Sequence, residues 1–146
     1  ADVPVFVRGV SAWGEGIGEQ LTPIEPREPW YLVLVPDCEV STAAIFSDPD
    51  LTRNSPSITM ADFVSGDDRN DCLEVVCRRY APVADALAWL SRYGKARLTG
   101  TGACVFAAFE REGEARDLLA LAPRELSGFV ARGMNRSPLL DRAAGR

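Results

Sequence analysis

The sequence predicts an α+β domain, because strand-like and helix-like segments follow one another without a regular β-α-β repeat. Three observations carry this prediction. Residues 30–35 (WYLVLV) form an apolar run too short for a helix, apolar residues recur at spacings of three and four from Leu73 to Leu90, and two strand-like segments flank the glycines of residues 100–102. A length of 146 residues suits one domain, or one domain with a remnant of another.

The elements from residue 30 onward can be placed in order. We expect a strand at 30–35, short helices at 42–46 and 58–64, a long helix from about residue 71 to Gly94, strands at 96–99 and 104–110, a helix at 112–122 and a strand at 128–132. Ser41 is a candidate cap for the first helix, Asn70 or Asp71 for the long helix, and Pro82 is where the long helix divides. This order is the split β-α-β pattern of ferredoxin-like sandwiches.

Both ends of the chain are less regular. Residues 3–7 predict a strand that Pro4 confines to an edge, residues 22–29 predict a connector, and residues 137–146 predict a loose tail. Because the chain opens in a strand-like run without an initiator Met, we expect it to be part of a longer protein.

Composition and charge exclude several classes of function. A net charge of −5 argues against an electrostatic nucleic-acid binder, and no apolar run is long enough to span a membrane. The chain has no histidine, which excludes an imidazole base from this chain and disfavours a zinc site. The four cysteines form no CxxC pair, so we expect reduced thiols in a cytoplasmic protein, although the sequence leaves a disulfide open.

The turn of residues 99–103 (TGTGA) is the first candidate site. Side chains are absent at Gly100 and Gly102, so backbone N–H groups can approach an anion closely, and successive N–H groups form an anion-binding concavity. The alternative is a plain hairpin turn between two strands, which spacing alone favours because short glycine motifs recur by chance.

Three further sets of residues have a functional and a structural interpretation. Asp2 is a candidate general base, and its structural interpretation is a solvated terminal residue. Thr42 and Phe46 are candidates to line a pocket in which Phe46 stacks on a planar ring, and their structural interpretation is a capped helix with a core phenylalanine. The acidic residues of 67–71 favour a solvated loop over a cation site. Taken alone, each of these patterns favours the structural interpretation.

Taken together, six segments resemble members of the GHMP kinase superfamily. These segments are ADVPVFVRG, EGIGEQLTPI, STAAIFSDPDLTRNSP, RNDC, SRYGKARLTGTGACVFAAF and GFVARGMNRSPL, in this order and spacing. The similarity is to those members that phosphorylate the 2-hydroxyl of 4-diphosphocytidyl-2-C-methyl-D-erythritol in non-mevalonate isoprenoid biosynthesis, with ATP and Mg²⁺. It implies a two-domain kinase in which residues 1–22 are a remnant of the N-terminal domain and residues 23–146 are the ferredoxin-like C-terminal domain.

The resemblance also assigns roles to residues. It implies that Asp2 is the catalytic aspartate and that Phe46 stacks on the cytosine ring in a substrate pocket lined by Thr42. It implies further that Gly100, Thr101 and Gly102 form a glycine-rich turn close to the nucleotide and substrate phosphates.

The resemblance also shows what this chain lacks. The superfamily's main ATP-binding loop, its catalytic lysine and a second stacking aromatic have no counterpart here, and we do not assign the missing lysine's role to Lys95, the only lysine. We therefore expect the chain alone to be inactive, and to pair with the missing kinase domain or to self-associate through an apolar patch that includes Val3, Val5 and Val7. The alternative is a ferredoxin-like binding or regulatory module without catalysis.

Overall fold

The computed structural model describes residues 3–64 and 66–145. They form two compact units: residues 29–131, and a smaller unit in which residues 3–28 associate with residues 132–145. The predicted division of the kinase at residues 22 and 23 concerns the domains of the whole enzyme and stays a prediction. Each unit is described by itself.

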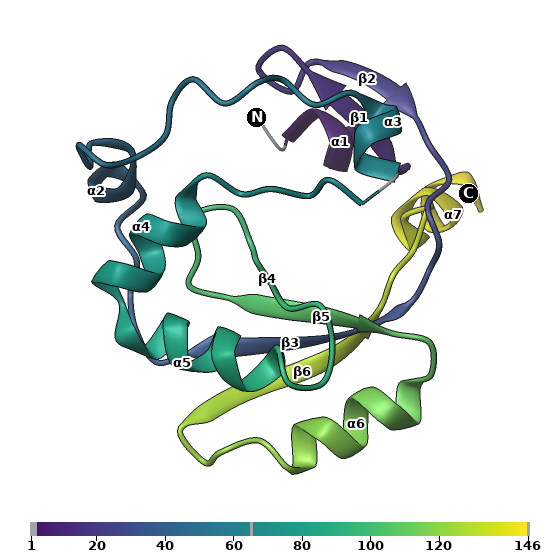
Figure 1. The fold of residues 1–146 in the computed structure, drawn as a ribbon. Helices are drawn as coiled ribbons and strands as arrows, with labels where there is room; N and C mark the ends of the chain where they lie inside the picture. The colour runs from purple at the N-terminus through teal and green to yellow at the C-terminus, as the bar shows by residue number, and fades with distance from the viewer. Residues whose placement is uncertain (1–2, 65, 146) are drawn as a thin grey trace. The chain divides into compact units, whose positions relative to one another are not determined.

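The larger unit is built on one four-stranded sheet (Figure 1). Its strands are β3 (Trp30–Pro36), β4 (Arg97–Leu98), β5 (Val105–Phe109) and β6 (Leu126–Arg132), and they lie in the order β4-β5-β3-β6. Strand β5 is antiparallel to both β3 and β4, with Leu32 opposite Ala107 and Leu98 opposite Val105. The first strand of this unit thus lies between the third and the fourth, which confirms the predicted ferredoxin-like order.

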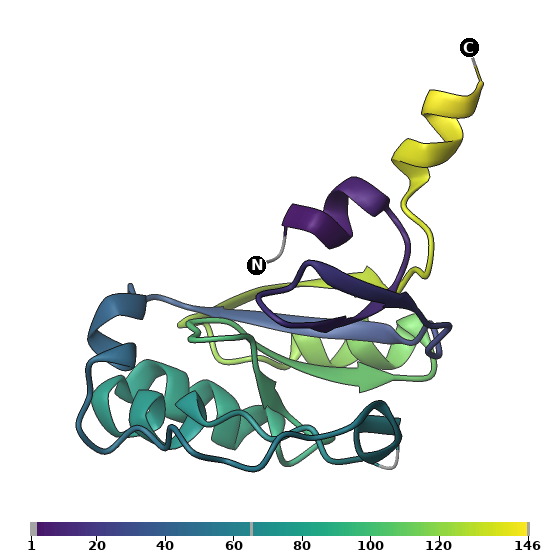
Figure 2. The same ribbon diagram turned by 90° about the horizontal axis from the view of Figure 1, so that it is seen from above.

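Five helices complete the described part of the larger unit. They are α2 (Thr42–Phe46), α3 (Met60–Val64), α4 (Cys72–Arg79), α5 (Ala81–Leu90) and α6 (Glu112–Ala120). Helices α5 and α6 both contact β3 and β5, and α4 and α5 lie on one side of the sheet when it is seen from above (Figure 2).

The core lies between the sheet and these helices. Alternate residues of the central strands, including Leu32, Leu34 and Val105, are fully buried, as are Val83 and Leu90 of α5. Each such side chain contributes about 1.5–3 kcal/mol by its removal from water. A half-buried strand usually alternates apolar and polar residues. Strand β3 does not, because Tyr31 and Val33, on the face opposite Leu32 and Leu34, are also hydrophobic.

The break between α4 and α5 follows from local chemistry. Tyr80 has φ −126° and ψ 87°, outside the helical region, and Pro82 occupies the first turn of α5. A proline is tolerated there because the first N–H groups of a helix have no partner within it. The predicted division of the long helix at this position is confirmed.

The smaller unit contains α1 (Val3–Arg8), the hairpin β1 (Ala12–Glu15) and β2 (Gln20–Pro23), and α7 (Pro138–Ala144). Backbone hydrogen bonds join its two distant segments, from Ser11 N to Asn135 O at 2.9 Å and from Ser137 N to Gly9 O at 2.8 Å.

Two predictions fail in this smaller unit. The expected strand at 3–7 is helix α1, because Pro4 falls in a first turn, where a helix accepts proline, and strand preference is weak against context. The expected loose tail contains α7, where Ser137 Oγ accepts a hydrogen bond from Leu139 N at 3.3 Å. The pair Ser137-Pro138 is a helix-start signal that the prediction overlooked.

Within the described residues, no helix is both long and apolar enough to cross a bilayer.

All four cysteines are free thiols, and burial raises the pKa of the Cys77 thiol.

Candidate functional site

A hollow of about 710 Å³ opens on the larger unit. Its walls come from the end of α2, the segment around α3, the start of α4, strand β4 and the glycine turn. Apolar and polar side chains share it, which is the composition of small-molecule sites. The apolar lining includes Phe46, Ile58, Phe63, Leu73 and Phe106, and the polar lining includes Asp68, Arg69, Asn70, Lys95, Arg97 and Thr101.

The glycine turn is a hairpin turn that also lines this hollow. It connects β4 and β5, and Thr99 N donates to Cys104 O at 3.0 Å while Gly102 N donates to Thr99 O at 2.7 Å. Gly100 has φ +48°, a left-handed conformation that glycine adopts without the steric cost of a Cβ. The turn is therefore a hairpin turn, and its Gly100 and Thr101 line the hollow.

The backbone of this turn leaves donors available for a ligand. Within the described residues, the N–H groups of Gly100 and Thr101 have no acceptor, whereas that of Gly102 closes the turn. Adjacent unpaired N–H groups can form an anion-binding concavity. Both residues also line the hollow.

Gly102 supports the turn rather than lining the hollow. Its φ is +91°, and a Cβ built on it would lie 3.2 Å from Leu98 Cδ1 and 3.6 Å from Val76 Cγ1. The turn therefore rests closely on the core at this residue, and a side chain would push it outward.

Asn70 fastens the turn to the start of α4. Its Nδ2 donates to Gly100 O at 2.7 Å and to Leu98 O at 3.3 Å, while its Oδ1 accepts from Cys72 N at 3.0 Å. The sequence pattern indicates Asn70 only as a helix cap. Its reach across to residue 100 depends on tertiary structure, so no local signal indicates it.

Helix α2 reaches the same turn from the other side. Thr42 Oγ1 lies 2.9 Å from Thr101 Oγ1, a hydrogen bond in which either hydroxyl can donate. Phe46 is one turn further along α2, and residues four apart share a helix face. The Phe46 ring lines the hollow and is 58% exposed, so one of its surfaces is open to a ligand.

A cluster of opposite charges forms another part of the wall. We call Asp68, Lys95 and Arg97 the Asp68 cluster. Lys95 Nζ lies 2.8 Å from Asp68 Oδ1, and Arg97 Nε lies 2.5 Å from Asp68 Oδ2 without hydrogen-bond geometry. Burial alone raises the pKa of Asp68, but the hydrogen bond from Lys95 and the charges of both cations outweigh burial and leave the pKa lowered.

The predicted site residues can now be placed. Phe46, Gly100 and Thr101 line one hollow, Thr42 is bonded to Thr101, and Gly102 lies beneath the turn. Asp2 lies outside the described residues. Their roles in catalysis and binding stay predictions.

The described residues contain no group of three or more acidic or cysteine side chains arranged to hold a metal ion. The acidic run of 67–71 is engaged in pairs instead, because Asp67 bonds Arg69 at 2.9 Å and Asp71 accepts from Ser55 Oγ at 2.8 Å.

Comparison with known proteins matches residues 64–126 to the family model described as GHMP kinases C terminal. A 4-diphosphocytidyl-2-C-methyl-D-erythritol kinase of Shewanella pealeana is 54% identical over 144 residues, which cover 99% of this chain and 51% of that protein. A protein of the same name from Pseudomonas fluorescens is 58% identical over 139 residues, covering 95% of this chain and 49% of that protein. The chain thus spans about half the length of the curated relatives it matches.

The fold is also similar to a solved structure. A crystal structure of 4-(cytidine 5'-diphospho)-2C-methyl-D-erythritol kinase matches with a TM-score of 0.73 at 20% identity, over 92% of this chain and 54% of that one. This likeness supports the fold alone. The family model and the curated relatives confirm the resemblance: the chain matches the C-terminal region of kinases of the GHMP superfamily.

Proposed function

We propose that the intact enzyme transfers the γ-phosphoryl group of ATP to the 2-hydroxyl of 4-diphosphocytidyl-2-C-methyl-D-erythritol, and that this chain forms part of the acceptor site. One observation carries the proposal. The hollow unites Phe46 with the turn at Gly100 and Thr101, which are far apart in the sequence and which the resemblance independently assigned to one site.

Each of these residues has a role suited to its position. The cytosine ring stacks on the exposed Phe46 ring, since aromatic rings bind planar bases through their faces. The unpaired N–H groups of Gly100 and Thr101 face the phosphates, and the hydrogen-bonded hydroxyls of Thr42 and Thr101 hold the turn and α2 in register. This arrangement fixes the acceptor before the reaction, which is the main contribution a protein makes to phosphoryl transfer.

Asp2 is the general base of this proposal. Its carboxylate accepts the proton of the attacking 2-hydroxyl as the oxygen forms its bond to the γ-phosphorus, and the bond between the γ-phosphorus and the β,γ-bridging oxygen breaks to release ADP. Base catalysis of this kind contributes roughly 10²–10⁴-fold to the rate.

ATP and Mg²⁺ are bound mainly outside this sequence. The glycine turn offers two unpaired N–H groups, the described residues contain no metal-binding cluster, and no segment of the sequence resembles the superfamily's main ATP-binding loop. When bound, Mg²⁺ neutralises the charge that develops on the transferred phosphoryl group. Gly100 and Thr101 suit a phosphate oxygen, so we place this chain's contact with the nucleotide or the substrate pyrophosphate at the turn.

The exposed side of α1 is proposed to pair with the other half of the kinase or with a second copy. Val3, Phe6 and Val7 are 70%, 81% and 77% exposed. Apolar groups exposed together often mark an interaction surface. Analytical ultracentrifugation of the isolated chain tests self-association, with Phe6→Ser as the variant that should reduce it.

We place the reaction in the cytoplasm, because all four cysteines are free thiols, as is usual in a reducing compartment.

The test is a coupled ADP-release assay on the intact enzyme with 4-diphosphocytidyl-2-C-methyl-D-erythritol. Asp2→Asn should lower kcat by about 10²–10⁴-fold and leave the substrate Kd nearly unchanged. Asp117→Asn on the exposed face of α6 is the matched control and should behave as the wild type. Full turnover of the Asp2 variant would show that Asp2 is not the general base.

The isolated chain should show no substrate-dependent ADP release. Substrate-dependent turnover by residues 1–146 alone would contradict the need for the missing ATP loop and lysine.

A further inference from the structure

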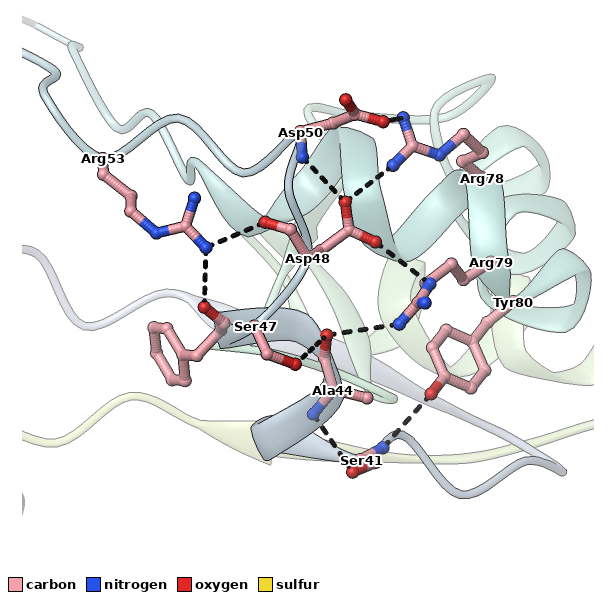
Figure 3. A network of polar contacts seen from close by, with 10 residues as sticks. Ser41, Ala44, Ser47, Asp48, Asp50, Arg53, Arg78, Arg79 and Tyr80 are labelled. Carbon is pink, nitrogen blue, oxygen red and sulfur yellow. Dashed lines mark hydrogen bonds and ion pairs between the residues drawn. The ribbon is translucent and has the colours of Figure 1, made fainter.

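Helix α2 carries Phe46 and Thr42, yet it is too short to hold itself in place. It has five residues, and isolated helices of this length are unstable in water. Its position therefore depends on bonds to the rest of the unit. Figure 3 shows these bonds. They involve Arg78 and Arg79 of α4, Tyr80, which follows them, and Arg53, which comes after α2 in the chain.

The start of α2 is held by two hydroxyl groups. Ser41 Oγ accepts from Ala44 N at 3.3 Å and caps the helix, and Tyr80 Oη accepts from Ser41 N at 3.3 Å. Tyr80 is the residue at which α4 gives way to α5. The start of α2 is thus tied to the break between these helices.

The segment just after α2 contains a buried carboxylate. Asp48 is only 4% exposed, and its Oδ1 accepts from Asp50 N at 3.0 Å and from Arg78 at 3.0 Å, while its Oδ2 lies 3.1 Å from Arg79 Nε. We call Asp48, Asp50, Arg78 and Arg79 the Asp48 cluster. A buried charge is stable only when it is paired and hydrogen-bonded, as this one is, so the backbone of Asp48 is fixed against α4.

Arg53 connects this fixed backbone to Phe46. Its NH2 group donates to Phe46 O at 2.8 Å and to Asp48 O at 2.8 Å, and its NH1 group donates to Leu51 O at 3.0 Å. Arg79 adds a bond to Ala44 O at 3.2 Å. Carbonyl oxygens at a helix end have no partner within the helix, and cations are favourable there.

We propose that Arg53 is a positioning residue: held on the Asp48 cluster, it fixes the carbonyl of Phe46 and so presents the exposed Phe46 ring to the hollow for recognition of the substrate's planar base. The inference rests on the proposed function for the identity of that base. Arg53 is not among the residues that line the hollow, so we expect it to act through Phe46. Its effect comes from pre-organising a ring that little else packs against, which reduces the entropy lost on binding.

The test is a double-mutant cycle in the intact enzyme, measuring KM for 4-diphosphocytidyl-2-C-methyl-D-erythritol, KM for ATP and kcat. Phe46→Ala removes the ring and should raise the substrate KM by about tenfold to a hundredfold. Arg53→Met keeps the side-chain length and should raise it about threefold to tenfold, with kcat and the KM for ATP within about twofold, because only uniform binding is lost.

The combined variant gives the decisive result. If Arg53 acts through Phe46, the double variant has the substrate KM of Phe46→Ala alone, because the ring to be positioned is gone. Arg53→Lys, which retains one charge but not the fork of donors, should recover part of the loss. Arg116→Met, which breaks an exposed pair with Glu112 in α6, is the matched control and should change none of these values.

The contrary outcomes are distinct. An unchanged KM in Arg53→Met, or effects of the two variants that multiply, overturns the positioning role while the proposed function stands. An unchanged KM in Phe46→Ala overturns both the stacking part of the proposed function and the positioning role. A fluorine NMR signal from 4-fluorophenylalanine at position 46 that is the same in wild type and Arg53→Met also overturns the positioning role, whether or not the enzyme turns over.

Discussion

Two acidic residues of the larger unit each face two cations, yet the structure uses them differently. Asp48 is 4% exposed, and both of its carboxylate oxygens are engaged by arginines of α4. Asp68 has a side chain that is 16% exposed, and its partners Lys95 and Arg97 are 60% and 39% exposed along the wall of the hollow. The Asp48 cluster joins secondary-structure elements, whereas the Asp68 cluster forms a surface that a ligand can reach.

The difference shows that ion-pair geometry alone does not reveal what a pair does. The distances in both clusters are similar, between 2.5 and 3.1 Å. What differs is burial and the backbone that each carboxylate fixes. Asp48 also accepts a backbone N–H, from Asp50, so removing its carboxylate releases the loop that follows α2.

The largest expected effect tests this contrast on stability. Asp48→Ala should lower the free energy of unfolding by about 2–3 kcal/mol, because the buried carboxylate's bonds to Arg78 and Arg79 are lost and the Asp50 N–H loses its acceptor. Urea unfolding of the isolated chain, followed by circular dichroism, measures the change. A loss below about 0.5 kcal/mol would show that the Asp48 cluster does not join α2 to α4.

The glycine turn sharpens the contrast between framework and ligand-facing residues. Gly102→Ala should cost about 2–3 kcal/mol, since an added Cβ combines a positive φ with close contact to Leu98. Gly100→Ala should cost only about 1–2 kcal/mol, because its Cβ meets open space and the strain of a left-handed residue is the whole penalty. Equal costs in the same urea experiment would contradict the view that only Gly102 rests on the core.

The Asp68 cluster should contribute less to stability, and in a pH-dependent way. Asp68→Asn should cost at most about 1 kcal/mol at pH 7, since partly exposed ion pairs contribute little. The pKa of Asp68 is lowered in the folded state, so its contribution is present above the unfolded pKa and is lost as the pH falls through the folded value. The unfolding free energies of wild type and variant should therefore converge below about pH 4. If the difference in unfolding free energy between wild type and Asp68→Asn stayed constant down to pH 3, packing and not charge would account for the effect.

The smallest stability change is expected at the hydroxyl pair. Thr101→Val removes the bond to Thr42 and should cost about 0.5–1 kcal/mol, because one partner remains exposed to water. Calorimetric titration of the intact enzyme with substrate should nevertheless show weaker binding than wild type. Unchanged substrate binding would show that the hydroxyl pair of Thr42 and Thr101 does not contribute to the substrate site.

Local signals predicted much of this fold correctly. Ser41 caps α2 through its own side chain, and Pro82 marks the start of α5, so both boundaries were readable from neighbouring residues. The helix α1 was missed because valines and a phenylalanine favour a strand when context is ignored.

The site was less predictable, for a physical reason. The resemblance named Phe46, Gly100 and Thr101, but the residues that hold them in place act across long sequence separations. Asn70 bonds Gly100, and Arg78 bonds Asp48, each 30 residues away along the chain. No periodicity or spacing rule indicates such a contact, since it exists only once the sheet and helices have packed.

The central claim is that the hollow beside Phe46 and the glycine turn receives the nucleotide end of the substrate. A crystal structure of the intact enzyme with bound 4-diphosphocytidyl-2-C-methyl-D-erythritol tests it most directly. The account predicts the cytosine ring lying against the face of Phe46, with a substrate phosphate within hydrogen-bond distance of the N–H groups of Gly100 or Thr101. A substrate bound elsewhere, with the Phe46 ring still exposed to water, would contradict it.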